Sequence, residues 1–557
     1  MANIVYSFVG GTDNSLQIPS IKGSALSINC YTENNTENNK QAKTYLQSCP
    51  GIKFKMSLGT DSKCDGLYVS STGLKTNDYE PNLFYAYKGS IYKIDKTFNS
   101  YEVIGEYALG NTVVFAESGG ERAVLLWVDG NAIYGYDLKT AEKVEITLPK
   151  RIDRNNSYIQ PSHIAVVDGT IILNDLGSSY VYYSIKFPLN TKERTVFDIV
   201  DKKVQYEEDG IRVKEKKVDS GKYCFLDDYG VQKYFNGSSS SDKTVALYSI
   251  GGLLAMYGTS SIEFWQKGSA ESYQSWQRVN YSINQEQGIE APYSLTSINN
   301  TQFCIGTGRA SAKCVYAIEG YNVKKISPAW LDEILNTNEV KNVKGWSYSY
   351  KGHQFYLFNI KDTCYVYDLK TNEWHTRTSR NFYNSGLGER SATGLGERSA
   401  TGLTKNYMPL YSVWWNNRIY TGSIENGNLY ELDENYYYED FDSEHSLPLL
   451  RVRQTPVITS NYKPFVMYEL TIECNVGFAN NYNTTSKLLL QISKDGGYEF
   501  GNIREANLGV KGNYTKRVRF LNLGMNRLCV IKLMYSEPTP FCITDSSIRY
   551  NELNTSI

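Results

Sequence analysis

The sequence predicts an all-β protein, a β-propeller of about seven blades followed by a C-terminal β-sandwich. Three observations support this prediction: the composition, a short repeated pattern, and a change in strand length near residue 446. The 557 residues include 47 Tyr and 44 Gly but only 7 Met. Aromatic side chains pack well on the half-buried face of a sheet, and Gly supplies the positive φ angles of tight turns. The composition therefore favours many strands joined by short hairpins.

A five-residue pattern repeats along the chain and marks the expected blades. The pattern apolar-Tyr-x-apolar-Asp occurs four times, and three weaker copies keep only part of it. Alternating apolar residues face one side of a strand, and an Asp at its end accepts hydrogen bonds from the backbone of the next turn. The seven copies are Ile91–Asp95, Ile133–Asp137, Tyr182–Lys186, Ile262–Trp265, Val315–Glu319, Cys364–Asp368 and Leu429–Asp433.

The spacing of these copies favours propeller blades. Their last residues lie 42, 49, 79, 54, 49 and 65 positions apart. Gaps of 42 to 54 residues are typical of one four-stranded blade, so we prefer a propeller to hairpins in some other all-β fold. The two long gaps contain a charged stretch near 201–220 and a Gly-rich stretch at 386–401, which we interpret as inserted loops.

The chain divides into three expected regions. They are an N-terminal extended or strand segment (1–58), the β-propeller (59–445) and a C-terminal β-sandwich (446–557). Beyond residue 446 the strands become longer and lose the blade pattern, as in Phe465–Cys474 and Leu528–Met534. Long strands with this texture are typical of a sandwich.

One helix is expected among the strands, over Ser327-Pro-Ala-Trp-Leu-Asp-Glu-Ile-Leu335. Ser327 is a good N-cap because its hydroxyl can accept a hydrogen bond from a free backbone N–H of the first turn. Pro328 suits the first helical position, where the missing N–H would have no partner in any case.

An octapeptide, Gly386–Thr393, is repeated without change as Gly394–Thr401. Two polar, Gly-rich copies bury little apolar surface, so we expect a surface excursion between blades. Deleting one copy is expected to change the free energy of unfolding by less than ~0.5 kcal/mol, measured by urea denaturation. A much larger loss of stability would show that the segment is packed against the propeller.

Charge and cysteine usage narrow the functional classes. The formal net charge is −1, so no overall basic field attracts nucleic acid. The ten Cys include no Cys-x-x-Cys pair and the four His lie apart from them, so we expect buried thiols, no metal and no cofactor. The N-terminal residues do not resemble a signal peptide, and no run approaches the ~18 apolar residues that span a bilayer. We expect folding in a reducing cytoplasm and no stable membrane insertion.

Each candidate for a catalytic group has a simpler structural interpretation. Ser493–Phe500 matches the Asp-box pattern, in which Ser and Asp side chains hold a hairpin turn. We interpret Asp332-Glu333 and Glu439-Asp440 as solvated acidic pairs rather than as the carboxylates of a glycosidase. Trp414-Trp415 could form a sugar platform, although a blade-core residue followed by a partly exposed neighbour explains it more simply. We expect no catalytic residue, and the sequence does not indicate which residues bind a partner.

Several short motifs occur in the order found in one protein family. They are Ile28–Tyr31, Tyr45–Ile52, Gly258–Trp265, Gln287–Ala291 and the order of strands over Leu488–Tyr550. Together they resemble the packaged-DNA stabilisation proteins, or tail accessory factors, of short-tailed bacteriophages (podoviruses). The duplicated octapeptide and the 201–220 insertion depart from the family pattern, so the contacts of these loops do not carry over.

The resemblance implies a structural virion protein and not an enzyme. Such a protein is a ring-forming tail hub in the head-to-tail connector of the phage tail, assembled in the host cytoplasm. Its partners would be further copies of itself, six or a multiple of six, the portal or head-to-tail adaptor, and the tail needle, spike or other tail proteins. It would close the portal channel and stabilise packaged DNA, which passes through without sequence-specific binding.

Two alternatives stay open at this point. One is a phage propeller glycosidase or depolymerase, and the other is a receptor-binding module that recognises host-surface glycan. Hydrolysis of a polysaccharide panel would identify the first. Adsorption of the purified protein to cells would identify the second.

Overall fold

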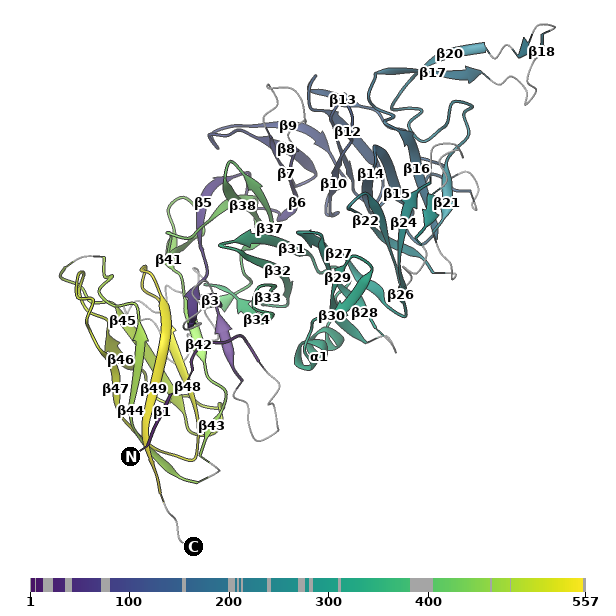
Figure 1. Ribbon diagram of the computed structural model, residues 1–557. Helices are drawn as coiled ribbons and strands as arrows, with labels where there is room; N and C mark the ends of the chain where they lie inside the picture. Colours follow the sequence, from purple (N-terminus) through teal and green to yellow (C-terminus); the bar gives the residue numbers. More distant parts are fainter. Residues whose placement is uncertain are drawn as a thin grey trace.

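The computed structural model confirms the predicted fold class. It describes residues 2–5, 7–13, 24–35, 43–71, 81–152, 157–198, 206–207, 210–211, 214–237, 242–268, 276–279, 284–308, 312–380, 404–460, 463–480 and 482–553. Figure 1 shows two parts, a propeller built from the middle of the chain and a sandwich built mainly from its C-terminal part.

Seven blades form the propeller in the described residues, and each has four antiparallel strands in order from a first to a fourth. Four blades are separate sheets, and blades 4, 6 and 7 belong to larger sheets. Blade 1 contains β6 (Cys64–Val69), β7 (Leu83–Tyr87), β8 (Ser90–Ile94) and β9 (Tyr101–Glu106), and blade 2 contains β10 (Val114–Glu117), β11 (Val124–Val128), β12 (Ile133–Asp137) and β13 (Glu142–Val144). Blade 3 contains β14 (Ile164–Val167), β15 (Thr170–Asn174), β16 (Tyr180–Lys186) and β21 (Tyr234–Asn236). Blade 4 contains β22 (Thr244–Ile250), β23 (Leu253–Gly258), β24 (Ser261–Lys267) and β25 (Trp276–Arg278), with β26 (Asn284–Gln285) also paired to β24. Blade 5 contains β27 (Gly288–Ile298), β28 (Thr301–Thr307), β29 (Lys313–Glu319) and β30 (Asn322–Lys325). Blade 6 contains β31 (Gly345–Tyr350), β32 (His353–Ile360), β33 (Thr363–Asp368) and β34 (Glu373–Arg377). Blade 7 contains β37 (Pro409–Trp415), β38 (Arg418–Ser423), β39 (Asn428–Asp433) and β5 (Gly51–Ser57).

All seven copies of the repeated pattern fall on the third strand of a blade. The Asp at the end of the strand has the expected local role. Asp137 Oδ1 accepts hydrogen bonds from the backbone N–H groups of Lys139 (2.9 Å) and Thr140 (3.1 Å). Asp368 Oδ1 accepts one from the N–H of Lys370 at 3.0 Å. Asp95 and Asp433 accept the backbone N–H groups of Thr97 and Asn435 in the same way, so the four copies that end in Asp each mark a turn of this kind.

The fourth strand of the last blade comes from the beginning of the chain. β5 pairs antiparallel with β39, and fully buried Ile52 lies opposite Leu432. Strands from near the start and the end of the propeller sequence therefore close the ring of blades. On its other edge β5 pairs in parallel with β40 (Tyr438–Asp440), and β41 (Ser446–Pro448) completes this sheet.

Two sheets and one apolar core make up the sandwich. The core includes Leu470, Leu488 and Ile531, all buried. The first sheet contains β3 (Cys30–Asn35), β4 (Lys43–Ser48), β49 (Cys542–Glu552), β44 (Phe465–Cys474) and β47 (Val518–Asn526), with β1 (Ala2–Val5) paired to β49. The second contains β42 (Arg451–Gln454), β48 (Leu528–Tyr535), β45 (Lys487–Ser493) and β46 (Arg504–Asn507), with β43 (Ile458–Thr459) paired to β48.

Strand β2 (Leu26–Ile28) joins the two domains in one continuous sheet. It pairs antiparallel with β42 of the sandwich and in parallel with β34 of blade 6. Residues 1–58, which were expected to form a region of their own, are divided between the sandwich, the junction and the propeller. β1, β3 and β4 lie in the sandwich, β2 at the junction and β5 in blade 7.

The insertion near 201–220 contains paired strands, where a loop was expected. The insertion lies between the third and fourth strands of blade 3. Figure 1 shows it as an arm of paired strands that extends away from the propeller, called the hairpin arm below. The duplicated octapeptide at 386–401 lies outside the described residues. The arm consists of two antiparallel pairs, β17 (Glu193–Asp198) with β20 (Lys214–Asp219), and β18 (Tyr206–Glu207) with β19 (Gly210–Ile211).

The expected helix is present as α1 (Ala329–Thr337), but its N-terminal boundary differs from the prediction. The N-cap is Pro328, with φ −75° and ψ 163°, and not Ser327. The Ser327 hydroxyl donates to Asp332 and accepts the backbone N–H of Val315 at 2.9 Å. Ser327 therefore ties the helix to blade 5, since Val315 belongs to β29.

Candidate functional site

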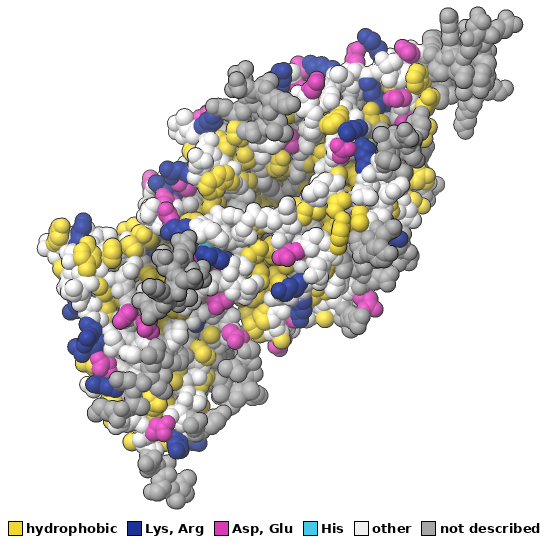
Figure 2. All heavy atoms as spheres, in the orientation of Figure 1, with side chains coloured by type: hydrophobic (Ala, Val, Ile, Leu, Met, Phe, Trp, Pro, Cys, Tyr) yellow, Lys and Arg dark blue, Asp and Glu magenta, His cyan; other side chains and the backbone are white. Residues whose placement is uncertain are grey.

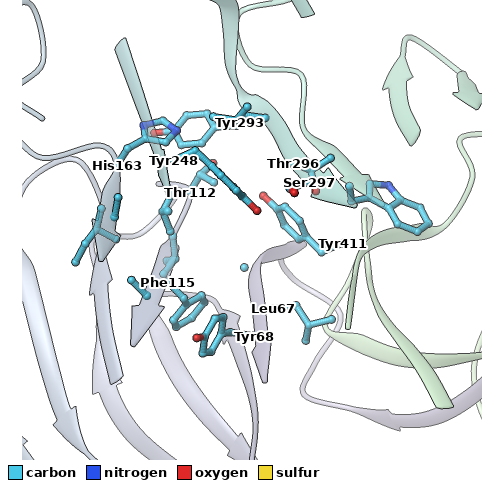
Figure 3. A pocket seen from close by; sticks show the side chains of 18 of the residues that line it. Leu67, Tyr68, Thr112, Phe115, His163, Tyr248, Tyr293, Thr296, Ser297 and Tyr411 are labelled. Atoms are coloured by element: carbon cyan, nitrogen blue, oxygen red, sulfur yellow. The ribbon is translucent and has the colours of Figure 1, made fainter. Parts of the chain in front are cut away.

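One cavity of the propeller is its central channel. It has a volume of about 660 Å³, and residues on or beside the first strand of all seven blades line it. Figure 3 shows aromatic rings entering this space from several directions. The channel is therefore a product of the complete ring of blades and of no single local motif.

Aromatic pairs and hydroxyl groups make up much of the channel wall (Figure 3). The rings of Tyr68 and Phe115 are stacked, with centroids 5.6 Å apart and planes 22° apart. His163 and Tyr293 are stacked in the same way, at 5.3 Å and 22°. The hydroxyls in the lining belong to Tyr68, Ser71, Thr112, Tyr248, Ser249, Tyr293, Thr296, Ser297, Ser347, Tyr411 and Ser412.

The channel wall carries little charge. The lining contains one carboxylic acid, Glu117, and one imidazole, His163, and no Lys, Arg or Asp is among the lining residues. Burial raises the pKa of Glu117, which accepts a hydrogen bond from the backbone N–H of Ser71 at 2.7 Å. Burial lowers the pKa of His163 to about 4, so its ring is neutral at pH 7.

A buried ion pair lies beside one part of the channel. Lys344 Nζ is 3.7 Å from Asp65 Oδ1, and Lys344 and Asp65 directly precede the lining residues Gly345 and Gly66. Tyr107 donates its hydroxyl hydrogen to the other oxygen of Asp65 at 2.8 Å. Burial lowers the pKa of Lys344 to about 8, since desolvation disfavours the charged amine.

Two register shifts place tyrosines in the channel. In β37 the shift lies between Leu410 and Val413, and Tyr411 has a φ of 59°. In β27 the register shifts between Ala291 and Thr296, around Tyr293. A bulge redirects a side chain, and a non-glycine residue at positive φ is kept only when the surrounding structure holds it. This arrangement is suited to holding a molecule against ring faces and hydroxyls.

The acidic pairs singled out in the sequence lie away from this channel. Asp332 and Glu333 lie on α1, and Asp332 forms an ion pair with Lys325. The interpretation of Glu439-Asp440 as solvated was wrong. Glu439 is fully buried and Asp440 is 9% exposed, because β40 packs beside β5.

The two tryptophans have the order opposite to the expected one. Trp415 is the buried residue and donates its indole N–H to the carbonyl of Pro81 at 2.8 Å. Trp414 is the exposed one, at 62%, and lines a second cavity of about 840 Å³ between blades 6 and 7, with Tyr350 and Arg418. The alternation of β37 places the first Trp outside and the second in the core.

The Asp-box pattern forms the expected turn, in the sandwich after β45. Asp495 Oδ1 accepts the hydroxyl hydrogen of Ser493 at 2.6 Å and the backbone N–H of Tyr498 at 3.0 Å. The Ser493 hydroxyl oxygen accepts the N–H of Gly497 at 2.8 Å. The motif therefore has a structural role in this chain.

All ten cysteines are free thiols, and nine of them are buried, as expected of small core residues. Within the described ranges no group of three or more His, Cys, Asp or Glu side chains could hold a metal ion. The same residues contain no helix that is long and apolar enough to cross a membrane.

Comparison with known families assigns both domains. The family model of the β-propeller of bacteriophage P22 Gp10 matches residues 226–437, and the model of its β-sandwich matches residues 450–551. These two domains in this order define a phage structural tail protein. The matched ranges cover more than half of the chain, which belongs to the family of bacteriophage P22 Gp10, a phage tail and DNA-stabilisation protein. This confirms the resemblance found in the sequence.

No curated protein sequence matches the chain. Solved structures that match it include the mitotic checkpoint complex (10% identity, TM-score 0.32, 67% of this chain and 92% of that chain). Another is the extracellular domain of the putative hybrid two-component system BT4673 from B. thetaiotaomicron (10% identity, TM-score 0.36, 85% of this chain and 47% of that chain). A third is the computationally designed Ika8 protein (10% identity, TM-score 0.31, 68% of this chain and 99% of that chain). Likenesses at these scores support no inference about this chain.

Proposed function

We propose that this protein is a ring-forming tail hub in the virion of a short-tailed phage. In this role several copies bind below the portal and its adaptor, close the portal channel and stabilise the packaged DNA. The observation that carries the proposal is the match of both domains to bacteriophage P22 Gp10, in the same order. The hub assembles in the host cytoplasm before it joins the virion.

The shape of the molecule suits a ring. Copies around an axis meet head to tail, so each needs two different contact faces. Figure 1 shows an elongated body with the sandwich at one end and the hairpin arm at the other. Strand β2 joins the domains in one sheet, which lets the body act as a single piece.

An exposed aromatic cluster marks one candidate contact face. Phe478, Tyr482 and Tyr514, on loops at one end of the sandwich, are 45%, 71% and 62% exposed. The Phe478 and Tyr514 rings touch edge to face at 5.5 Å, and Lys511 lies over the Tyr482 ring. Figure 2 shows hydrophobic side chains gathered over the upper end of the sandwich. Protein interfaces are enriched in aromatic residues, so this sandwich-end cluster suits contact with a neighbouring copy or the adaptor.

Electron microscopy of intact virions and of the purified chain with its adaptor tests the proposal. We expect a closed ring on the tail axis, with six copies or a multiple of six. The double variant Tyr482→Ser/Tyr514→Ser is expected to fold normally and assemble poorly. Tyr158→Ser, at a 54% exposed site on the propeller, is the matched control. Single off-axis copies, or none in the virion, would exclude a hub.

The proposal also assigns no catalytic activity to the chain. Its support is the family, which is one of phage structural proteins. Purified protein is expected to hydrolyse no polysaccharide, ester or peptide. Turnover that disappears with a single Asp or Glu substitution would contradict this assignment.

A further inference from the structure

Trp414 is the one strongly exposed tryptophan of this chain. All eight Trp lie within the described residues, and the other seven are buried or half-buried. The side chain of Trp414 is 62% exposed, although its neighbour in β37, Trp415, is anchored in the core. A large aromatic surface in contact with water is unfavourable, so an exposed Trp on a regular element is typical of a binding site.

A tight hairpin turn positions Trp414. Trp415 pairs with Arg418, and the two residues between them, Asn416 and Asn417, have φ angles of 47° and 62°. Two consecutive positive φ angles are characteristic of a type I′ turn, whose twist matches that of a hairpin, and Asn tolerates them well. The backbone that carries Trp414 is therefore paired strand beside a two-residue turn and not a long loop.

Trp414 lines two cavities at once. One is the cavity of about 840 Å³ between blades 6 and 7, and the other, of about 370 Å³, is lined by residues of blades 5, 6 and 7. Ser349, Trp414 and Ile419 belong to both, so the two cavities adjoin at the indole. Figure 1 shows the strands that carry these residues, β31, β37 and β38, side by side. Both volumes fall in the range of roughly 300–1,000 Å³ usual for small-molecule sites.

The smaller cavity offers neutral polar groups. No charged side chain is among the described residues that line it. Its serine and asparagine residues are Ser297, Asn299, Ser347, Ser349 and Ser412. A hydroxyl group both donates and accepts hydrogen bonds, and so does a side-chain amide. This lining therefore matches a ligand that carries several hydroxyl groups.

The charges around the larger cavity balance one another. Lys351 Nζ is 2.8 Å from a carboxylate oxygen of Glu434, and Tyr350 donates its hydroxyl hydrogen to the same oxygen at 3.2 Å. Arg418 forms an ion pair with Glu431. The charged groups that line this cavity or pair with its lining are three positive and three negative, Lys55, Lys351, Arg418, Glu431, Asp433 and Glu434. This balance favours a neutral ligand over an ion.

The carboxylates near Trp414 favour a saccharide over a peptide. The hydrogen bond from Lys351 lowers the pKa of Glu434, so this carboxylate is ionised at pH 7 and only accepts hydrogen bonds. Sugar hydroxyls donate to such oxygens, while the C–H face of a sugar ring packs on an aromatic ring. A proline-rich segment also packs on aromatic rings, but it lacks N–H groups and would give the carboxylates no donor.

We propose that the two adjoining cavities, called the Trp414 groove, bind a neutral oligosaccharide, with one sugar ring on the indole and hydroxyls on Ser349, Asn417 and Glu434. This is binding without hydrolysis. The proposal goes beyond the tail-hub role and does not depend on it, because a single copy of the chain contains the whole groove.

Titration of the full-length protein with small sugars tests the proposal. The neutral probes are maltose, cellobiose, lactose and N,N′-diacetylchitobiose. Glucose 6-phosphate serves as a charged sugar, and hexaproline with blocked ends serves as the peptide. Calorimetry measures each Kd. We expect at least one neutral disaccharide to bind with a Kd in the low millimolar range or tighter, and neither of the other two probes to bind as tightly.

Fluorine NMR and variants locate the bound sugar. In protein that carries 5-fluorotryptophan, the signal that Trp414→Phe removes belongs to Trp414, and we expect this signal to shift as the sugar is added. Trp414→Ala is expected to weaken the Kd at least about tenfold, and Trp414→Phe, which keeps a ring face, by less. Tyr158→Ala, at an exposed site that lines neither cavity, is the matched control and should leave the Kd unchanged.

Several results would overturn the proposal. They are no binding of any neutral disaccharide, tighter binding of glucose 6-phosphate or hexaproline, and an unchanged Kd in Trp414→Ala. A shift of other tryptophan signals without that of Trp414 would place the sugar elsewhere. If Trp414→Ala does not fold, the fluorine signal of Trp414 in the parent decides. Absence of a ring in the virion would contradict the tail hub alone, since the sugar Kd is measured on the isolated chain.

Discussion

Replacing Asn29 with Ala is expected to lower the free energy of unfolding by about 3–5 kcal/mol. Asn29 is 1% exposed and lies where the propeller, β2 and the sandwich meet. Its Nδ2 donates to the carbonyls of Leu450 (2.8 Å) and Thr378 (3.0 Å), and its Oδ1 accepts the N–H of Thr378 (3.2 Å). Alanine would leave these three backbone groups buried without a partner. The backbone at Asn29 has a φ of 55°, and this angle adds strain in the Ala variant because Asn tolerates the left-handed region better than Ala does.

Guanidinium denaturation followed by far-ultraviolet circular dichroism measures the effect. Asn417→Ala is the matched control, since Asn417 has a similar φ of 62° but is exposed. It is expected to cost about 1 kcal/mol, which is the contribution of backbone strain alone. Equal losses in the two variants would mean that the Asn29 hydrogen bonds add nothing to the junction.

Glu439 is expected to make the protein less stable as the pH rises from 5 to 8. Its side chain is fully buried, and one oxygen accepts the backbone N–H of Arg380 at 2.9 Å. Burial raises its pKa from 4.5 to about 7, against the opposing effect of Arg380, Lys405 and Arg451. A carboxyl group whose pKa is raised on folding favours the folded state most below pH 4.5. That advantage is lost as the pH passes 7, by about 2–3 kcal/mol.

The variant Glu439→Gln removes this titration. It is expected to be more stable than the parent by about 2–3 kcal/mol at pH 8 and to differ little at pH 5. Urea denaturation at both pH values measures the difference, and Glu444→Gln, at an exposed site nearby, is the matched control. If parent and Glu439→Gln lose stability in parallel with pH, the carboxyl group is already ionised in the folded protein.

Short sequence patterns predicted the blades because the contacts behind each pattern join residues that are close together in the sequence. In Ile133–Asp137 the alternation forms the strand, and the Asp bonds to a turn two and three residues ahead. Each signal therefore lies within one stretch of about eight residues. Counting such stretches was enough to predict seven blades, since a blade contains one third strand.

Pairings between distant segments could not be predicted in this way. Gly51–Ser57 has the composition of a strand, but nothing within it indicates that its partner is β39, more than 370 residues later. The burial of Glu439 has the same origin, because β40 pairs with the distant strand β5 as well as with the neighbouring strand β41.

The channel was missed for a related reason. Its lining comes from seven separate strands, and the direction of Tyr411 depends on a bulge that sequence periodicity does not reveal. A run of apolar and aromatic residues such as Pro409–Trp415 predicts a strand. It does not predict which ring faces the axis of a propeller.

The early strands of this chain must wait for partners that the ribosome makes several hundred residues later. β1 pairs with Ser547–Tyr550, and β5 cannot close blade 7 before Asn428–Asp433 exists. At roughly 5–20 residues per second, β1 emerges about half a minute to two minutes before its partner is complete. During that time several strand edges stand open to wrong pairing, a known route to aggregation. Folding of this protein therefore depends on the synthesis of these late strands, and slow translation extends the period of risk.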